Sequence, residues 1–154
     1  MLLDERPGYP MCFFIETHLS GDFSIQRLRA AVETAIERHP RLRSHTQHNE
    51  QGWLWTPSDK LPQVVQLQCI EDRESQAIAF RPFNIRQEPG IRFIVIPEGN
   101  QQWSIVLQVH HSVCDGLAAL EFLGDIWSLY HGNEPTEFQT HSRRKYIQTD
   151  SDND

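Results

Sequence analysis

The segment Gln108-Val109-His110-His111-Ser112-Val113-Cys114-Asp115-Gly116 connects a strand-like pattern to a helix-like pattern. Residues 103–109 before it alternate with a period of two, which predicts a β-strand. Residues 117–130 after it carry apolar side chains at helical spacing, and His131-Gly132 closes the predicted helix. The segment is therefore a corner between a strand and a helix, and it carries two adjacent histidines and an acid-glycine pair.

The two histidines are predicted to lie on opposite faces of the strand. Because successive strand side chains alternate, His111 continues the face that ends at Val109, and His110 continues the face of Gln108. We therefore expect His111 to point into the body of the protein and His110 to be structural. Partial burial favours a neutral imidazole, which is the form that a general base needs. The apolar face that leads to His111 consists of Trp103, Ile105, Leu107 and Val109.

Composition favours one polar globular domain. The 154 residues are 38% hydrophobic and 23% charged, with a net charge of -7, which argues against partners such as nucleic acid or a membrane surface. No apolar run approaches the roughly 20 residues of a spanning helix, and the first residues do not resemble a secretory signal. Three cysteines, an odd number, favour free thiols and a cytoplasmic location: Cys12, Cys69 and Cys114.

Periodicity and turn residues predict an α+β fold with helices packed on a sheet. The predicted strands are 11–19, 42–47, 53–56, 64–70, 91–96 and 103–109, and the predicted helices are 25–39, 72–80 and 117–130. Ser24 is the expected N-cap of the first helix, and Pro40 is expected to stop it. Residues 1–132 form the predicted domain, and 133–154 a polar, linker-like tail that we expect to be disordered. Residues expected in the core include the four tryptophans and, on the last helix, Leu117, Leu120, Leu123, Ile126, Trp127 and Tyr130.

Three segments resemble motifs of one family. His110-His111-Ser112-Val113-Cys114-Asp115-Gly116 fits HHxxxDG, and Arg38-His39-Pro40-Arg41-Leu42-Arg43-Ser44 is similar to RHxxLR. Arg81-Pro82-Phe83-Asn84-Ile85 with Gly90-Ile91-Arg92 resembles PFDL followed by GPLxR, with Asn84 in place of the acid. In this order, the chain resembles the N-terminal half of condensation-domain proteins, within the chloramphenicol acetyltransferase-like superfamily. Family proteins are longer, and their second half forms the far wall of the active-site channel.

The resemblance implies a two-layer sandwich, with a mixed sheet and helices packed on it, that forms half of a condensation-type protein. It also implies acyl transfer from a coenzyme A or carrier-protein phosphopantetheine thioester to an alcohol or amine, as in nonribosomal peptide synthesis. His111 would be the general base, and no cofactor would be bound permanently. The expected partners are the thioester donor, the small acceptor and a carrier protein. Either a homo-oligomer or a missing C-terminal half would complete the site.

Asp115 is expected to be structural, in an ion pair with an arginine that fixes the corner. Arg43 and Arg38 are candidates through the resemblance, and Arg92 is a third. Loss of a partner from a buried ion pair costs roughly 3–5 kcal/mol, so this expectation assigns Asp115 to folding. Gly116 is expected to adopt a backbone conformation closed to other residues or to permit a close helix approach.

Other interpretations of the corner remain open at this stage. A metal site built from His110, His111 and Asp115 is disfavoured, because neighbouring strand side chains point apart, and no metal is expected. Cys114 could be a nucleophile beside a histidine, although a small apolar role behind the turn is favoured. In another functional class, the chain would be a truncated, non-catalytic half-domain that serves at most as a binding or interaction module.

Overall fold

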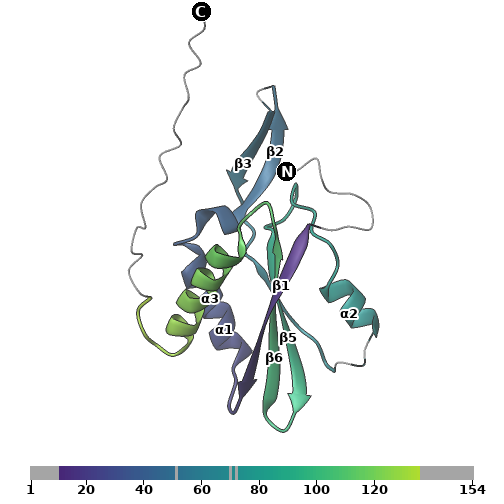
Figure 1. Cartoon of the computed structure of the whole chain (residues 1–154), viewed down its shortest axis with the longest axis vertical. Helices are drawn as coiled ribbons and strands as arrows, with labels where there is room; N and C mark the ends of the chain where they lie inside the picture. The colour runs from purple at the N-terminus through teal and green to yellow at the C-terminus, as the bar shows by residue number, and fades with distance from the viewer. Residues whose placement is uncertain (1–10, 51, 70, 72, 136–154) are drawn as a thin grey trace, which may run out of the picture.

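The computed structural model describes residues 11–50, 52–69, 71 and 73–135 (Figure 1). The elements in chain order are β1 (Cys12–Ser20), α1 (Ile25–Ile36), the 3-10 turn η2 (Pro40–Arg43), β2 (Ser44–Asn49), β3 (Gly52–Pro57), β4 (Gln63–Gln66), α2 (Arg73–Ala79), β5 (Ile91–Gly99), β6 (Gln102–His110) and α3 (Gly116–Tyr130). This arrangement confirms the predicted α+β class. The predicted tail lies outside the described residues from position 136 onward.

The main sheet is mixed, as predicted. Its strand order is β1-β6-β5-β4, in which β6 pairs antiparallel with both β1 and β5, and β4 runs parallel to β5. The hairpin β2–β3 forms a separate two-stranded sheet that projects beyond one end of the main sheet (Figure 1). Strand β4 ends at Gln66 and is shorter than the predicted 64–70.

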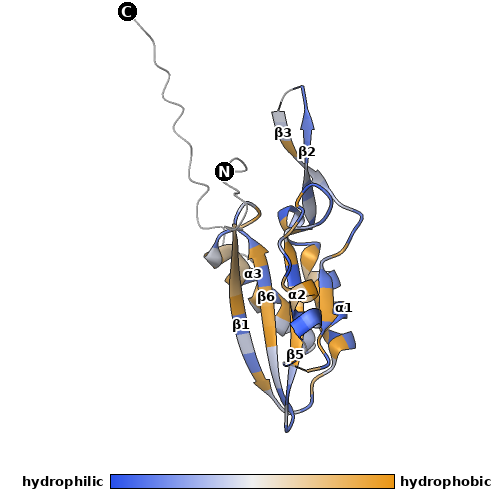
Figure 2. Ribbon diagram, turned by 90° about the vertical axis from the view of Figure 1, so that its right-hand side faces the viewer, coloured by the Kyte–Doolittle hydropathy of each residue, from blue (hydrophilic) through white to orange (hydrophobic). Residues whose placement is uncertain are grey.

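Helices cover both faces of the main sheet. α1 and α3 pack together over one face, and α2 lies against the other (Figures 1 and 2). The central strands β5 and β6 are therefore buried on both sides, which explains their largely hydrophobic colouring in Figure 2. No helix among the described residues is both long and apolar enough to cross a membrane.

The N-cap and the buried stripe predicted for α1 are confirmed, whereas its predicted end is not. Ser24 is the N-cap, and its Oγ accepts the N–H of Arg27 at 3.2 Å. The helix ends at Ile36 and not at His39, because the residue before a proline disfavours helical backbone and His39 has φ -125°. The buried stripe consists of Leu28, Ala31, Val32, Ala35 and Ile36.

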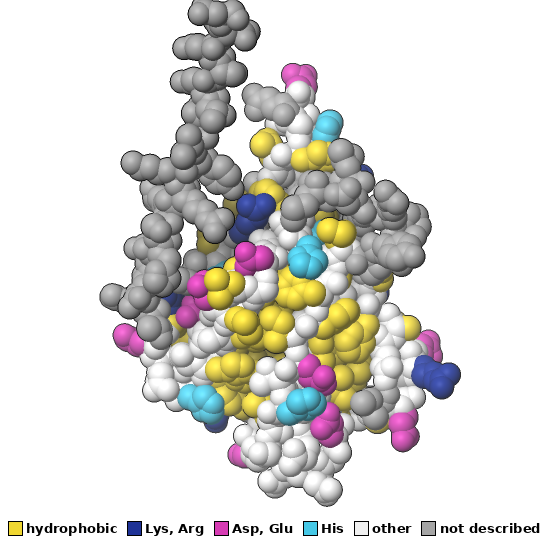
Figure 3. Space-filling view, in the orientation of Figure 1, with side chains coloured by type: hydrophobic (Ala, Val, Ile, Leu, Met, Phe, Trp, Pro, Cys, Tyr) yellow, Lys and Arg dark blue, Asp and Glu magenta, His cyan; other side chains and the backbone are white. Residues whose placement is uncertain are grey.

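The buried face of α3 agrees with the prediction in part, since Leu123, Ile126 and Tyr130 are buried as predicted. Leu117 and Leu120 were expected in the core, but they are 68% and 55% exposed. Ala119 and Phe122 take their places in the stripe that packs against α1 and the sheet, which consists of Ala119, Phe122, Leu123, Ile126 and Tyr130. Trp53 is also not a core residue, since it is 37% exposed under the guanidinium of Arg86. Hydrophobic side chains are visible across the middle of one face of the molecule (Figure 3).

A buried arginine joins the loop before β5 to the sheet. Arg92 is 1% exposed, and its Nη1 donates to the carbonyls of Ala79 and Arg81 and to Gln108 Oε1 at 2.9–3.0 Å. Its Nη2 lies 3.4 Å from Glu88, which Arg81 also holds by two short hydrogen bonds. Burial raises the pKa of Glu88, but the hydrogen bonds from Arg81 and from the backbone outweigh it, so the pKa lies below its usual value.

Replacing Arg92 with methionine should destabilise the fold strongly. The change leaves Glu88 and Gln108 without this donor, and breaking such a buried pair costs about 3–5 kcal/mol. The free energy of unfolding, measured by urea denaturation followed by circular dichroism, checks this. Arg73→Met is the control, because Arg73 is exposed on α2 and should change stability by about 0.5 kcal/mol or less. Equal losses in the two variants would contradict the role given to Arg92.

Candidate functional site

Backbone hydrogen bonds hold the histidine corner from both neighbouring strands. The N–H of His110 donates to the Gly90 carbonyl at 2.8 Å, and the N–H of His111 donates to the Met11 carbonyl at 2.7 Å. The N–H of Val113 donates a hydrogen bond to the His110 carbonyl at 3.0 Å, and this bond closes the turn. A Cβ at Gly90 would lie 2.7 Å from Val113 Cγ1, so the corner needs glycine at that position.

His110 lies on the strand face opposite Val109, as strand alternation predicts, and it is buried beneath the corner. It is 2% exposed and lies on the face of Gln108. Its Nδ1 is 2.7 Å from Ser112 Oγ and accepts the Ser112 N–H at 3.2 Å. These contacts hold the His110 ring against the turn that follows it.

His111 is exposed, which corrects the expectation that it points into the interior. The strand ends at His110, so the alternation that leads through Val109 does not extend to His111. Its ring packs against Phe13, with centroids 4.6 Å apart and an interplanar angle of 46°. Among the residues that the structure describes, none forms a hydrogen bond to this ring.

Asp115 caps a helix and does not form the expected ion pair. Its Oδ1 accepts the N–H of Ala118 at 2.9 Å, and Asp115 is the N-cap of α3. The first N–H groups of a helix lack internal acceptors, so a carboxylate at this position satisfies one of them. No arginine within the described ranges pairs with Asp115. The three candidates have other partners: Arg43 binds Glu37 and the Ser58 carbonyl, Arg38 lies 3.6 Å from Asp125, and Arg92 binds Glu88.

Gly116 also differs from its expectation. It is the first residue of α3, its φ is not positive, and a Cβ built on it meets nothing within 4 Å. Neither the backbone conformation nor the packing requires a glycine at position 116. Gly90 is the glycine that close packing at the corner does require.

An open pocket of about 620 Å³ lies in front of the corner. One wall is the segment that precedes and includes η2, and the other is the turn that begins at His111. Arg41 joins the two walls, since its Nη2 donates to the Ser112 carbonyl at 3.3 Å while its guanidinium lies over Trp55. The lining residues are His39, Pro40, Arg41, Leu42, His111, Ser112, Val113, Cys114, Asp115 and Ala118. The structure thus places His111 and Asp115 at one pocket with His39, but leaves Arg38 and Arg43 outside its lining.

A His–Asp contact behind one wall was not predicted from the sequence. His39 Nε2 lies 2.9 Å from Asp125 Oδ2, and the edge of its ring contacts Phe122 with centroids 5.0 Å apart. Asp125 is buried on α3, so this contact ties the pocket wall to the helix. An acid on the buried side of a helix was the available signal, but the predicted stripe did not include position 125.

Cys114 is a poor nucleophile in this setting. Burial and, to a smaller extent, the Asp115 carboxylate raise the pKa of its thiol to about 11, although Arg41 opposes the shift. A thiol reacts as its thiolate, so a raised pKa lowers its reactivity near neutral pH. This favours a filling role behind the turn over nucleophilic catalysis.

Replacing Asp115 with alanine should cost about 1 kcal/mol, the usual value of a lost N-cap, and not the 3–5 kcal/mol of a broken buried ion pair. Chemical denaturation measures the difference. Asp115→Ser keeps an oxygen that can cap the helix and should retain most of the stability. If serine were as harmful as alanine, or if either cost several kcal/mol, the capping role would be wrong.

Alkylation of the native chain should distinguish its cysteines. With a pKa of about 11, the thiolate fraction of Cys114 near neutral pH is on the order of 100-fold below that of an ordinary thiol. Iodoacetamide labelling followed by peptide mass spectrometry should therefore modify exposed Cys69 long before Cys114. Labelling of both at the same rate in folded protein would contradict the raised pKa.

Comparison with known proteins agrees with the motifs. A family model described as Condensation domain matches residues 5–153. Tyrocidine synthase 3 of Brevibacillus parabrevis is 27% identical over 125 residues, which are 79% of this chain and 2% of that protein. Bacitracin synthase 3 of Bacillus licheniformis is 26% identical over 145 residues, which are 86% of this chain and 2% of that protein.

The fold is similar to that of a solved condensation domain. The starter condensation domain of rhizomide synthetase RzmA superposes with a TM-score of 0.66 at 19% identity, over 83% of this chain and 34% of that one. This chain thus spans about a third of the solved domain and a small part of the curated relatives. It belongs to the condensation domain family and has the chloramphenicol acetyltransferase-like fold that its motifs imply.

Proposed function

We propose that this chain forms one wall of a condensation-type acyl-transfer site, with His111 as its general base. The observation that carries the proposal is the position of the His111 ring, exposed at the rim of an open pocket and held there by the ends of two strands. A general base must reach the proton that it removes, and an accessible ring at a pocket meets that requirement.

The proposed reaction needs one proton relay and no covalent enzyme intermediate. The neutral His111 ring removes the proton from an alcohol or amine as that group attacks the carbonyl carbon of a thioester. The carbon–sulfur bond then breaks, and the imidazolium returns the proton to the leaving thiolate. General-base catalysis of this kind contributes about 10²–10⁴ in rate.

The donor in this proposal is an acyl thioester on coenzyme A or on the phosphopantetheine arm of a carrier protein. The acceptor is a small alcohol or amine, and no cofactor is resident. A pocket of about 620 Å³ lies within the roughly 300–1,000 Å³ of small-molecule sites. The thioester arm and the acceptor are both co-substrates, as the family's part in nonribosomal peptide synthesis implies.

In this proposal, a second polypeptide segment completes the site. The pocket is open on the side that η2 and the histidine turn do not cover, and His111 is exposed there. Catalytic electrostatics strengthen when water is excluded, so an opposing wall would raise the activity of this corner. Either a second copy of the chain or the remaining part of a longer condensation-type protein would supply that wall.

A non-catalytic role is the second candidate, and two observations favour it. No described residue forms a hydrogen bond that would orient the His111 ring, and Asp115 lacks the arginine partner expected of a rigid corner. In that case the chain would serve as a binding or interaction module that presents the same pocket.

Thiol release separates the two candidates. The chain is incubated with acyl-coenzyme A or an acyl-carrier protein and a panel of alcohols and amines, and free thiol is measured. His111→Ala should lower turnover by about 10²–10⁴ with little change in the melting temperature. His131→Ala is the control, because His131 is exposed at the far end of α3 and away from the pocket.

Sedimentation with and without the acyl donor accompanies the assay. Self-association together with thiol release would support an acyltransferase completed by a second copy. Retained turnover in His111→Ala would remove His111 from the role of base. A monomer that releases no thiol with any acceptor would leave only the binding module.

A further inference from the structure

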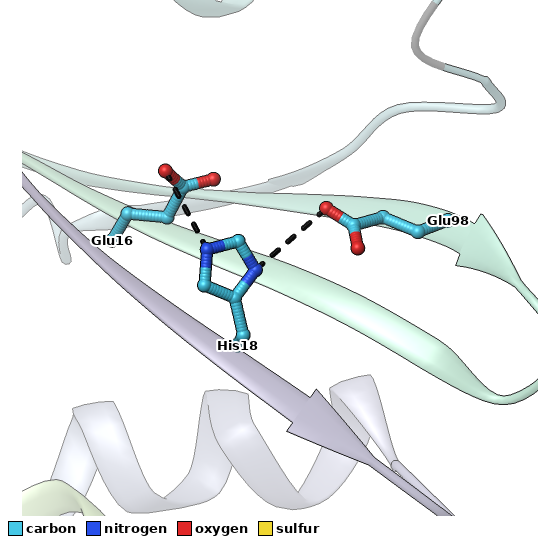
Figure 4. A group of neighbouring side chains, drawn as sticks. All are labelled: Glu16, His18 and Glu98. Atoms are coloured by element: carbon cyan, nitrogen blue, oxygen red, sulfur yellow. Dashed lines mark ion pairs between the residues drawn. The ribbon is translucent and has the colours of Figure 1, made fainter.

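A second cluster of chemically competent side chains lies far from the pocket, on the sheet face that α1 and α3 do not cover. Glu16 and His18 are two residues apart on β1 and therefore share a face, and Glu98 comes from the end of β5 on the far side of β6. Figure 4 shows the His18 ring between the two carboxylates. Its Nε2 lies 3.8 Å from Glu16 Oε2, and its Nδ1 lies 3.8 Å from Glu98 Oε1.

The central strand leaves room for this cluster and orients part of it. Ser104 of β6 is the register partner of His18 on one side and of Ile96 on the other, so a small side chain is the neighbour of His18 on the adjacent strand. The Ser104 hydroxyl donates to Glu16 Oε1, which leaves Oε2 turned toward His18. A hydrogen bond of this kind, from a neighbour to a ligating carboxylate, is what orients ligands in metal sites.

The charge of the cluster is not balanced by basic residues. Among the described residues, no lysine or arginine forms an ion pair with Glu16 or Glu98, and the ion-pair contacts of both carboxylates are with His18. With a neutral imidazole, the cluster carries two negative charges in a chain of net charge -7. A divalent cation would neutralise both carboxylates at once.

We propose that Glu16, His18 and Glu98 form a binding site for a zinc-type divalent cation. One ligand atom from each residue lies within 4.8 Å of the other two. Tetrahedral zinc, with bonds of about 2.0–2.1 Å, places its ligands about 3.3 Å apart, so the separations between the donors must shorten by at most about 1.5 Å. All three side chains are exposed and can rotate. An imidazole nitrogen with two carboxylates suits zinc, whereas calcium and magnesium prefer oxygen alone.

The site would join the edge strand to the interior of the sheet. Among the described strands, β1 lies at the edge of the sheet and pairs with β6 alone, and Glu98 belongs to the strand beyond β6. One ion bound to both strands would stabilise the folded chain. The stabilisation would grow as the zinc concentration rises above the dissociation constant of the site. Water would take the fourth position, because the site opens to solvent.

Isothermal titration of the tag-free chain with zinc chloride, together with its melting temperature, tests the proposal. We expect one tight site per chain and a melting temperature that rises with zinc. His18→Gln and Glu98→Gln should each weaken that site by on the order of 10–100-fold. His131→Gln is the matched control and should leave the affinity unchanged, since that exposed histidine lies outside the cluster.

Circular dichroism should confirm that each variant is folded, and Glu98→Gln has no buried contact to lose. Cobalt(II) absorption provides a second readout, because a low-coordinate nitrogen–oxygen site gives visible bands that His18→Gln should abolish. The proposal is overturned if the wild-type chain shows no zinc-dependent heat or thermal shift, or if both ligand variants bind as tightly as the control. Equal binding of calcium would overturn the zinc assignment. None of these readouts depends on acyl transfer.

Discussion

The pairing of β6 with a strand on each side is the constraint on which the corner depends. Hydrogen bonds to β6 continue to its last residue and one beyond it, where the N–H groups of His110 and His111 reach Gly90 and Met11. Both faces of the strand are buried, so a slip of one residue would exchange its two sets of side chains and is strongly disfavoured. The position of the histidine pair is therefore set by backbone pairing in the sheet and does not depend on the side chains that line the pocket.

Local polar contacts, and not a long-range ion pair, shape the turn that follows. Asp115 fixes the start of α3, the His110 ring bonds to Ser112, and Arg41 reaches across to the Ser112 carbonyl. Each of these bonds satisfies a polar group that the strand-to-helix transition would otherwise leave without a partner. The geometry of the pocket thus follows from the way in which one strand ends and one helix begins.

Polar side chains that are buried or partly buried attach the other two motif segments to the framework. The loop before β5 is held through Arg92, Glu88 and Arg81, and the segment before η2 is held through the contact of His39 with Asp125. Such groups are stable when buried only if they are paired and hydrogen-bonded. The three motifs therefore share a structural role, which is to join loops to the sheet and to α3.

The sequence by itself determined the elements, their order and the opposite placement of His110 and Gln108 relative to Val109, because side-chain periodicity follows directly from backbone geometry. Periodicity also predicted the buried stripe of α1, whereas the family was indicated by the resemblance of three motifs. The sequence did not determine the exposure of His111, the exposure of the first leucines of α3, the partner of Asp115 or the contact between His39 and Asp125. Only the tertiary structure decided these, because each depends on where a strand stops or how a helix is turned against its neighbours. The packing of one element against another brings together residues that are far apart in the sequence, and no pattern along the chain records it.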